Sequence, residues 1–169
     1  VAGVASELVI TPAAERTLLH EVGPGALAEA RGLATINHDA DDIGARIASG
    51  SAPVGGMIVA PCSMRSLGAI AHSLSGNLLV RAADVQLKER RPLVLIARET
   101  PLHLGHLRTM AAVTEMGAIV LPPAPAFYLR PESVQAIVDQ IAARAIDLLR
   151  IMPPLAEAWS AKTTPPQAV

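Results

Sequence analysis

The sequence GMIVAPCSMRSLGAIAHSLSGNLLVRAADVQLKERRPLVLIARE, which runs from Gly56 to Glu99, decides the fold. It opens with a short apolar run, Met57–Ala60, and closes with a second one, Leu93–Ala97. Each run has the length of a strand, lacks clear alternation and ends in polar residues, which is typical of parallel strands buried on both faces. Helical segments around residues 65–73 and 82–90 lie between the runs. The stretch therefore predicts a strand–helix–strand core.

Polar side chains follow both apolar runs. Ser63 comes after the first run, and Arg98 and Glu99 come after the second. Ligands of open α/β sheets bind beyond the carboxyl ends of the strands, so we expect a site there. On the intervening helix Arg81 and Lys88 share a face, about 10 Å apart along the axis. Two aligned cations near two strand ends predict a pocket for an anion.

The rest of the chain extends the same alternation. Across the whole chain, strands are predicted at residues 7–11, 56–60, 92–97 and 118–121, and further helices at 13–21, 39–49, 105–116 and 133–149. Residues 23–34 read as loop with some helix. This order predicts an α/β fold with a doubly wound, mostly parallel sheet. We expect one α/β domain over residues 1–152 and a C-terminal arm or disordered tail over 153–169.

Composition narrows the class of protein. A chain of 169 residues that is 51% hydrophobic but only 2% aromatic must build its core from small apolar side chains. The surplus of small apolar residues predicts that part of the apolar surface is buried between subunits, so we expect a homo-oligomer. A net charge of −1 does not suggest nucleic-acid binding, because domains that bind nucleic acid usually carry excess positive charge. The lone Cys62 fits a reducing cytoplasm. No stretch is typical of a membrane span or a signal peptide.

Five blocks carry a family resemblance: SGS (49–51), APCSM (60–64), RAADVQLKERRPLVL (81–95), RETPLHLGHL (98–107) and PPAPAFYLRPES (122–133). They are similar to the flavin prenyltransferase (UbiX) family, from about residue 7 to about residue 152. The resemblance implies an enzyme that transfers a dimethylallyl group from dimethylallyl monophosphate to N5 of reduced FMN, then closes a ring at C6, without a metal. It also implies dodecameric shells and a product used by UbiD-type decarboxylases, including the one in ubiquinone biosynthesis.

The start of the chain departs from this family. Family members open with a strand, a Gly-Ala-Ser-Gly turn at the flavin phosphate and a helix. Here the chain starts at what should be the second strand, and Val1–Ala5 offers no equivalent turn. Because every later motif is intact, we expect a truncated first unit rather than a protein that binds flavin poorly.

The resemblance assigns several residues to the flavin and to proton transfer. It places one set at FMN, with Thr11 replacing a serine of the family: Thr11, Ser63, Met64, Arg65, Ser66 and Arg98. It gives Glu99 and Glu21 roles as acid or base. From the residues alone, Ser63 would be a plain helix N-cap and Glu21 a solvated helix end.

The resemblance also implies a phosphate site made by Arg81, Lys88, Tyr128 and Arg144, with the first two acting across a subunit contact. Arg144 shares a helical stripe with apolar residues, so its guanidinium should be buried and should meet an anion. A structural salt bridge or snorkelling would also explain it. Arg81 and Lys88 could equally form a surface ion network with Asp84, and ordinary loop packing would explain Tyr128.

Three tempting signals have plainer explanations. The acidic run at residues 38–42 reads as a solvated helix start, since prenyl-diphosphate enzymes need two aspartate-rich clusters. His103 and His106 lack a third metal ligand nearby. Cys62 has no adjacent base, so we interpret it as packing rather than as a nucleophile.

Two other functions remain open. One is an FMN-dependent cysteine decarboxylase, whose relatives have a Pro-Ala-Ser-Ala-Asn-Thr-like turn and a catalytic histidine. Here the turn reads Pro-Cys-Ser-Met-Arg-Ser, and the surroundings of His20 do not match. The other is a non-catalytic flavin-binding or assembly subunit, which the absence of a first unit would favour.

Overall fold

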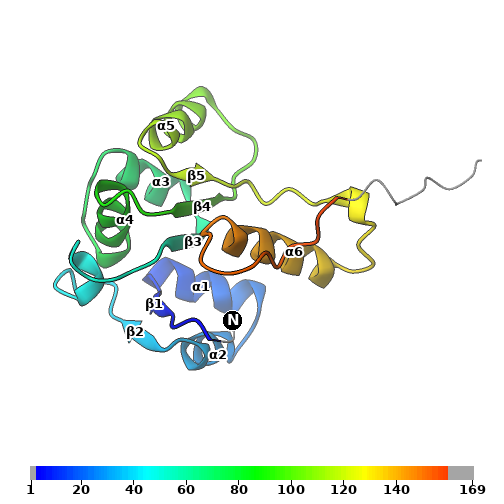
Figure 1. Cartoon of the computed structure of the whole chain (residues 1–169), viewed down its shortest axis with the longest axis horizontal. Helices are drawn as coiled ribbons and strands as arrows, with labels where there is room; N and C mark the ends of the chain where they lie inside the picture. Colours follow the sequence, from blue (N-terminus) through cyan, green and yellow to red (C-terminus); the bar gives the residue numbers. More distant parts are fainter. Residues whose placement is uncertain (1–2, 160–169) are drawn as a thin grey trace, which may run out of the picture.

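The computed structural model describes residues 3–159, in which strands alternate with helices as the sequence predicts (Figure 1). The strands are β1 (Glu7–Val9), β2 (Ile36–His38), β3 (Met57–Cys62), β4 (Leu93–Ala97) and β5 (Ile119–Val120). The helices are α1 (Pro12–Glu21), α2 (Ala26–Leu33), α3 (Met64–Ala71), α4 (Leu78–Lys88), α5 (Leu104–Glu115) and α6 (Val134–Asp147), with short 3-10 turns η1 (Arg46–Ala48) and η2 (Phe127–Leu129). The α/β class is confirmed.

All strand pairs are parallel, but they form two sheets rather than one. β1 pairs with β2, and a second sheet has the order β3-β4-β5. Val9 of β1 and Met57 of β3 nevertheless pack against the same cluster, which contains Leu78 and Ala82 of α4. In a doubly wound sheet of order 3-2-1-4-5-6, the first strand lies between the second and the fourth. The break between the β1-β2 sheet and the β3-β4-β5 sheet falls at that position.

Helices cover both faces of the three-stranded sheet. Leu93, Leu95 and Ala97 of β4 face the main core, to which α3, α4 and α5 contribute. The alternate residue Val94 faces α6, where it packs against Ala145 and Leu149. This alternation follows from the two-residue period of a strand. The apolar run that predicted a doubly covered strand is confirmed.

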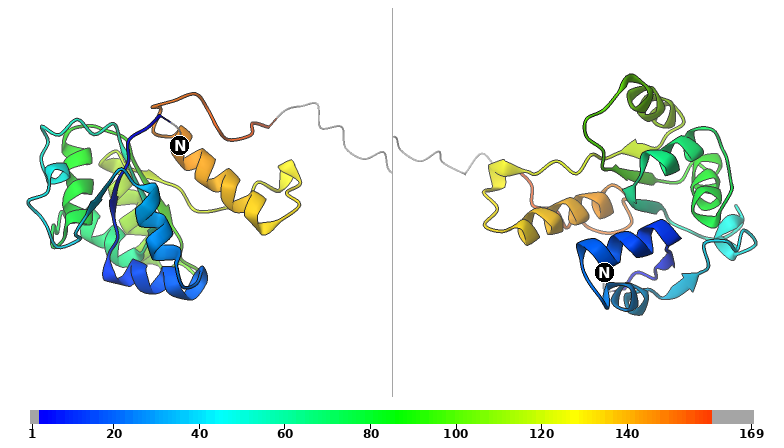
Figure 2. Two further views of the ribbon diagram at one scale, coloured as in Figure 1. Left: turned by 90° about the horizontal axis from the view of Figure 1, so that it is seen from below. Right: turned by 180° about the vertical axis from the view of Figure 1, so that it is seen from behind.

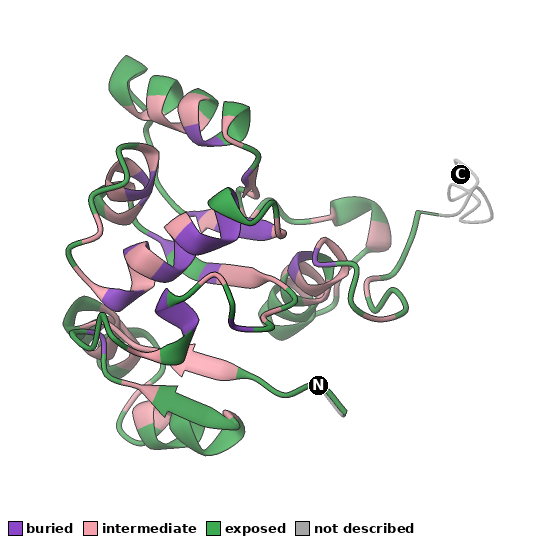
Figure 3. Cartoon of the chain, turned by 60° about the vertical axis from the view of Figure 1, so that its left-hand side comes forward, coloured by how far each residue is buried: buried purple, intermediate pink, exposed green. Residues whose placement is uncertain are grey.

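The N-terminal unit, made of β1, α1, α2 and β2, is much less buried than the elements around the three-stranded sheet (Figure 3). Neither α1 nor α2 contains a buried residue. The side chains of Leu19, Val22 and Leu33 are 57%, 70% and 79% exposed. Burial of apolar side chains is the main favourable term in folding. The helices beside the sheet break therefore contribute less to stability than α3 and α4 do.

The sequence prediction was wrong for residues 39–49. Instead of a helix, turns precede the single 3-10 turn η1. The Asp39 carboxylate accepts a hydrogen bond from the backbone N–H of Asp41, and that of Asp42 accepts one from Gly44, at 3.0 and 3.1 Å. Aspartate side chains that bond the nearby backbone compete with the helix. The region 23–34, expected to be mostly loop, contains the full helix α2.

The C-terminal part projects from the body. η2 and the start of α6 extend outward on the loop that follows β5 (Figures 1 and 2). The chain then folds back along α6, since Leu155 and Ala156 donate backbone hydrogen bonds to the Asp147 carboxylate. The predicted arm at 153–169 is described only to residue 159, and residues 160–169 lie outside the described part. Across residues 3–159, the structure contains no helix of the length and apolar character needed to cross a membrane.

Candidate functional site

A pocket of about 420 Å³ lies beyond the carboxyl ends of β4 and β5. Its lining comes from these strand ends and the loops after them: Ala97, Arg98, Glu99, Thr100, Pro122, Pro123 and Ala124. Sequence reasoning placed Arg98 and Glu99 at such a position, and the structure puts both in the wall of this cavity. The Glu99 side chain also accepts a hydrogen bond of 3.2 Å from the backbone N–H of Thr100.

Glu21 joins this pocket through an ion pair. Arg98 Nη2 donates a hydrogen bond of 3.0 Å to Glu21 Oε1, although 77 positions separate the two residues. Both side chains are more than half exposed. Glu21 is an exposed helix end, as the sequence alone suggested, and its carboxylate also meets the guanidinium at the end of β4. Two carboxylates and one cation thus gather at one edge of the sheet.

Two helices near the strand ends begin with hydroxyl caps. Ser63 Oγ accepts a hydrogen bond of 3.2 Å from the backbone N–H of Ser66, which makes Ser63 the N-cap of α3. Thr11 caps α1 in the same way by accepting from Ala14. Ser63 and Arg65 are exposed, and Met64 and Ser66 are half-buried. Helix N-termini present backbone N–H groups to anions, so this donor set suits the phosphate and the polar ring edge of a flavin nucleotide.

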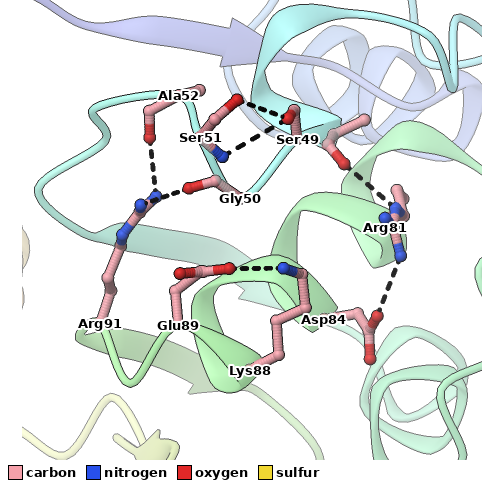
Figure 4. A network of polar contacts seen from close by, with 10 residues as sticks. Ser49, Gly50, Ser51, Ala52, Arg81, Asp84, Lys88, Glu89 and Arg91 are labelled. Atoms are coloured by element: carbon pink, nitrogen blue, oxygen red, sulfur yellow. Dashed lines mark hydrogen bonds and ion pairs between the residues drawn. The ribbon is translucent and has the colours of Figure 1, made fainter.

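The two cations of α4 belong to a separate polar network (Figure 4). Arg81 donates to the backbone carbonyl of Ala48 from Nε and to Asp84 Oδ2 from Nη1, both at 3.2 Å. Lys88 Nζ contacts Glu89 Oε1 at 2.5 Å rather than Asp84. This hydrogen bond, followed by the charge of Lys88, lowers the pKa of the Glu89 carboxyl below its ordinary value. The sequence allowed an ion network of Arg81, Asp84 and Lys88. In the structure Asp84 pairs with Arg81, and Lys88 pairs with Glu89 instead.

Arg91, which sequence reasoning did not select, is part of this network. Its guanidinium donates to the backbone carbonyls of Gly50 and Ala52 at 2.6 and 2.8 Å. Both partners are main-chain groups about forty positions earlier in the chain, at separations of 41 and 39 residues. Because any residue type has a backbone carbonyl, no sequence pattern reveals such a contact.

Arg144 and Tyr128 are not among the residues that line the pocket beyond β4 and β5. Tyr128, in η2, is 52% exposed. Arg144 is exposed too, so the expectation of a buried guanidinium was wrong. The buried residue of α6 is Ala145, which packs with Leu149 just beyond the helix, and its neighbour Arg144 faces solvent. Within residues 3–159, none of the ion pairs involves Arg144.

The four predicted phosphate residues do not meet within one chain. Tyr128 precedes α6, whereas Arg144 lies near the end of that helix (Figure 1). The ten positions from Val134 to Arg144 alone span about 15 Å along the helix axis. Arg81 and Lys88 extend from α4, which packs on the opposite face of the sheet from α6.

The remaining polar side chains show no metal centre. In the described part of the chain, no three His, Cys, Asp or Glu residues are grouped so that they could hold a metal ion. The rings of His103 and His106 stack with centroids 3.6 Å apart, and His103 caps α5. Cys62 is fully buried, and burial raises the pKa of its thiol to about 12. A protonated thiol in the core is a packing group rather than a nucleophile.

Comparison with known proteins places this geometry in a family. The family model described as Flavoprotein matches residues 2–146. The flavin prenyltransferase UbiX of Thauera aromatica is 53% identical over 145 residues, which cover 86% of this chain and 74% of that protein. UbiX of Escherichia coli K12 is 49% identical over 154 residues, covering 91% and 81%. This chain belongs to the UbiX flavin prenyltransferase family.

Solved structures of the family have the same fold. AnUbiX (PadA1), crystallised with FMN and dimethylallyl pyrophosphate, superimposes with a TM-score of 0.86 at 43% identity, covering 93% of this chain and 83% of the other. A dodecameric FMN-dependent UbiX-like decarboxylase from Escherichia coli O157:H7 gives 0.86 at 40% identity, covering 94% and 85%. The α/β architecture predicted from the strand and helix pattern is thus shared along nearly the whole chain.

Proposed function

We propose that this chain is a flavin prenyltransferase that moves a dimethylallyl group from dimethylallyl monophosphate to N5 of reduced FMN and then closes a ring at C6. The observation that carries the proposal is the pocket beyond β4 and β5, where Arg98, Glu99 and Glu21 gather in a fold shared with FMN-binding relatives. The product would serve UbiD-type decarboxylases, including the one in ubiquinone biosynthesis. The buried free thiol of Cys62 supports the cytoplasm as its compartment.

The residues proposed to hold FMN are those that cap helices or end a strand near this pocket. The Ser63–Ser66 turn offers backbone N–H groups and hydroxyls, Thr11 offers a further hydroxyl, and Arg98 offers a cation. When bound, reduced FMN supplies the nucleophilic nitrogen and the ring carbon that form the two new bonds. The side chains of this chain would fix the orientation of the ring and exclude water from it.

Departure of phosphate from an allylic carbon leaves negative charge on oxygen. Cations and hydroxyl donors that are already in place stabilise such charge without reorganisation. In this proposal the cations and the hydroxyl donor come from four side chains: Arg81, Lys88, Tyr128 and Arg144. The proposed reaction therefore does not depend on a metal. Breaking the carbon–oxygen bond releases inorganic phosphate, and the allylic carbon bonds to the flavin nitrogen.

Because these four residues lie apart in one chain, we propose that neighbouring copies complete the phosphate site. Apolar side chains around the projecting segment are exposed: Phe127 is 71% and Val134 is 77% exposed. Surfaces of this kind mark contacts between subunits. A dodecamer, the assembly described for the related E. coli O157:H7 protein, would supply such contacts.

Ring closure would break the carbon–carbon double bond of the attached group: one of its carbons gains a proton, the other bonds to C6, and C6 loses its proton. The step therefore needs a proton donor and a proton acceptor, and positioned carboxyl groups can serve as both. Glu99 and Glu21 are the candidates. Arg98 holds the Glu21 carboxylate in place through the 3.0 Å ion pair.

Anaerobic incubation of the protein with reduced FMN and dimethylallyl monophosphate, followed by mass spectrometry of the released flavin, tests the function. We expect FMN that carries one added dimethylallyl unit, together with an equal amount of phosphate. Unmodified FMN from a protein that visibly binds flavin would instead support the non-catalytic subunit.

A further inference from the structure

The loop at residues 49–52 is clamped by the end of α4 and the residues after it (Figure 4). The Arg91 guanidinium donates to the carbonyls of Gly50 and Ala52 at 2.6 and 2.8 Å. Ala52, the last residue of this loop, is buried. Two carbonyls on one guanidinium fix both the position and the orientation of this turn.

Both cations that are proposed to bind phosphate lie against this loop or against Ala48, the residue before it. Arg81 Nε donates to the carbonyl of Ala48, directly before the loop. Gly50 lies so close to the Lys88–Glu89 pair that a Cβ at position 50 would overlap the Glu89 carboxylate and come within 2.5 Å of Lys88 Nζ. The position of this loop therefore limits where the side chains of Lys88 and Arg81 can lie.

We propose that Arg91 is a positioning residue for the phosphate of the substrate. By holding the loop at residues 49–52 in place, it keeps the Lys88 ammonium and the Arg81 guanidinium in their binding orientation. This inference rests on the proposed function, since it requires that these two cations bind dimethylallyl monophosphate. In this account Arg91 acts through the loop and does not bind the substrate itself.

Chemistry explains why an arginine is needed here. A guanidinium presents several N–H groups in a fixed planar fork, so it can bond two carbonyls at once. A lysine ammonium keeps the charge but acts as a flexible point donor. The account therefore distinguishes geometry from charge, because Arg91→Lys should lose affinity for the phosphate although the net charge is unchanged.

The test measures the affinity for dimethylallyl monophosphate by calorimetry in the flavin-loaded protein. We expect Arg91→Gln to weaken this affinity about tenfold, the size expected for losing hydrogen bonds to a charged group. Arg91→Lys should fall between Arg91→Gln and the unmodified chain. Affinity for FMN should not change. The matched control is Arg90→Gln, since Arg90 is the exposed neighbour and loses the same charge.

A second variant changes the loop itself and leaves Arg91 in place. Gly50→Ala keeps Arg91 but should push away the flexible ends of Lys88 and Glu89, so it should also weaken dimethylallyl monophosphate binding several-fold. Since only side-chain ends must move, this variant should fold even if Arg91→Gln does not.

Equal substrate affinity in Arg91→Gln and Arg90→Gln would overturn the proposal, even if the melting temperature of Arg91→Gln falls. Absence of dimethylallyl monophosphate binding to the unmodified chain would overturn it as well. If that ligand binds as described but no prenylated flavin forms, the proposed function fails while the role of Arg91 in binding stands.

Discussion

Arg98, at the end of β4, donates a 3.0 Å hydrogen bond to Glu21, at the end of α1. This pair ties the N-terminal unit to the pocket beyond β4 and β5. Because both side chains are more than half exposed, the pair adds little to stability, about 0–1 kcal/mol for surface ion pairs in general. Its value therefore lies in orienting the Glu21 carboxylate rather than in holding the fold.

Replacing Glu21 by Gln should separate chemistry from stability. Loss of a general base slows a reaction by about 10²–10⁴-fold, so formation of prenylated FMN should slow by at least the lower figure. The melting temperature should stay nearly constant, and FMN should still bind. Product formation measured by mass spectrometry over time checks this expectation.

The matched control for this variant is Glu15→Gln. Glu15 lies on the same helix and forms a similar exposed ion pair with Arg31 at 2.9 Å, far along α1 from the pocket. If Glu15→Gln and Glu21→Gln slow product formation equally, the role of Glu21 as acid or base is wrong.

Replacing Arg144 by Ala should abolish most of the affinity for dimethylallyl monophosphate without destabilising the protein. Exposed side chains contribute within about 0.5 kcal/mol to stability when they make no special contact. Loss of a charge-assisted contact to phosphate should instead weaken binding by about tenfold or more. Calorimetric titration with the substrate, combined with thermal unfolding, measures both quantities.

Arg108→Ala provides the comparison for Arg144→Ala, because Arg108 is equally exposed on α5 and has no proposed role. Unchanged substrate affinity in Arg144→Ala would remove this residue from the phosphate site. A large loss in the Arg108 variant would show that the effect is only one of net charge.

The thiol of Cys62 should make stability depend on alkaline pH. Burial raises its pKa from the ordinary value of 9.0 to about 12, so the folded chain holds this proton more tightly than the unfolded chain does. The stabilising contribution is therefore complete below pH 9.0 and is lost progressively as the pH rises toward 12. Unfolding by denaturant, measured from roughly pH 7 to pH 11, reveals the slope.

Cys62→Ala should flatten this alkaline decline and should still form product, since the thiol is treated as a packing group. Loss of all activity in a folded Cys62→Ala protein would argue for a chemical role. A decline of the same steepness in both proteins would assign the pH dependence to other groups.

The sequence predicted the centre of the fold well because its signals are local. The apolar runs of β3 and β4 and the serine cap of α3 each depend on neighbouring residues. β2 was missed, since this short strand depends on distant partners, including the 2.7 Å contact between His38 and Glu7. Long-range pairing of this kind leaves no periodic pattern in the strand itself.

The candidate site was predicted only where motifs mark it. Arg98 and Glu99 follow a clear strand, so their place at the pocket could be derived. The pairing of Glu21 with Arg98 and the contacts of Arg91 depend on tertiary packing, and neither follows from residue spacing. The stripe argument for Arg144 was wrong because the helix packs through Ala145 and Leu149, one position around the face.

The central claim is that cations from separate copies of this chain gather around one departing phosphate beside the flavin. The most direct test mixes two variants with impaired product formation, Lys88→Ala and Arg144→Ala. Subunits are exchanged, and native mass spectrometry confirms the mixed oligomers. The account predicts that mixed oligomers regain part of the prenylated FMN production, because some interfaces pair two intact halves of the site. Mixed oligomers that remain as inactive as either variant alone would contradict it.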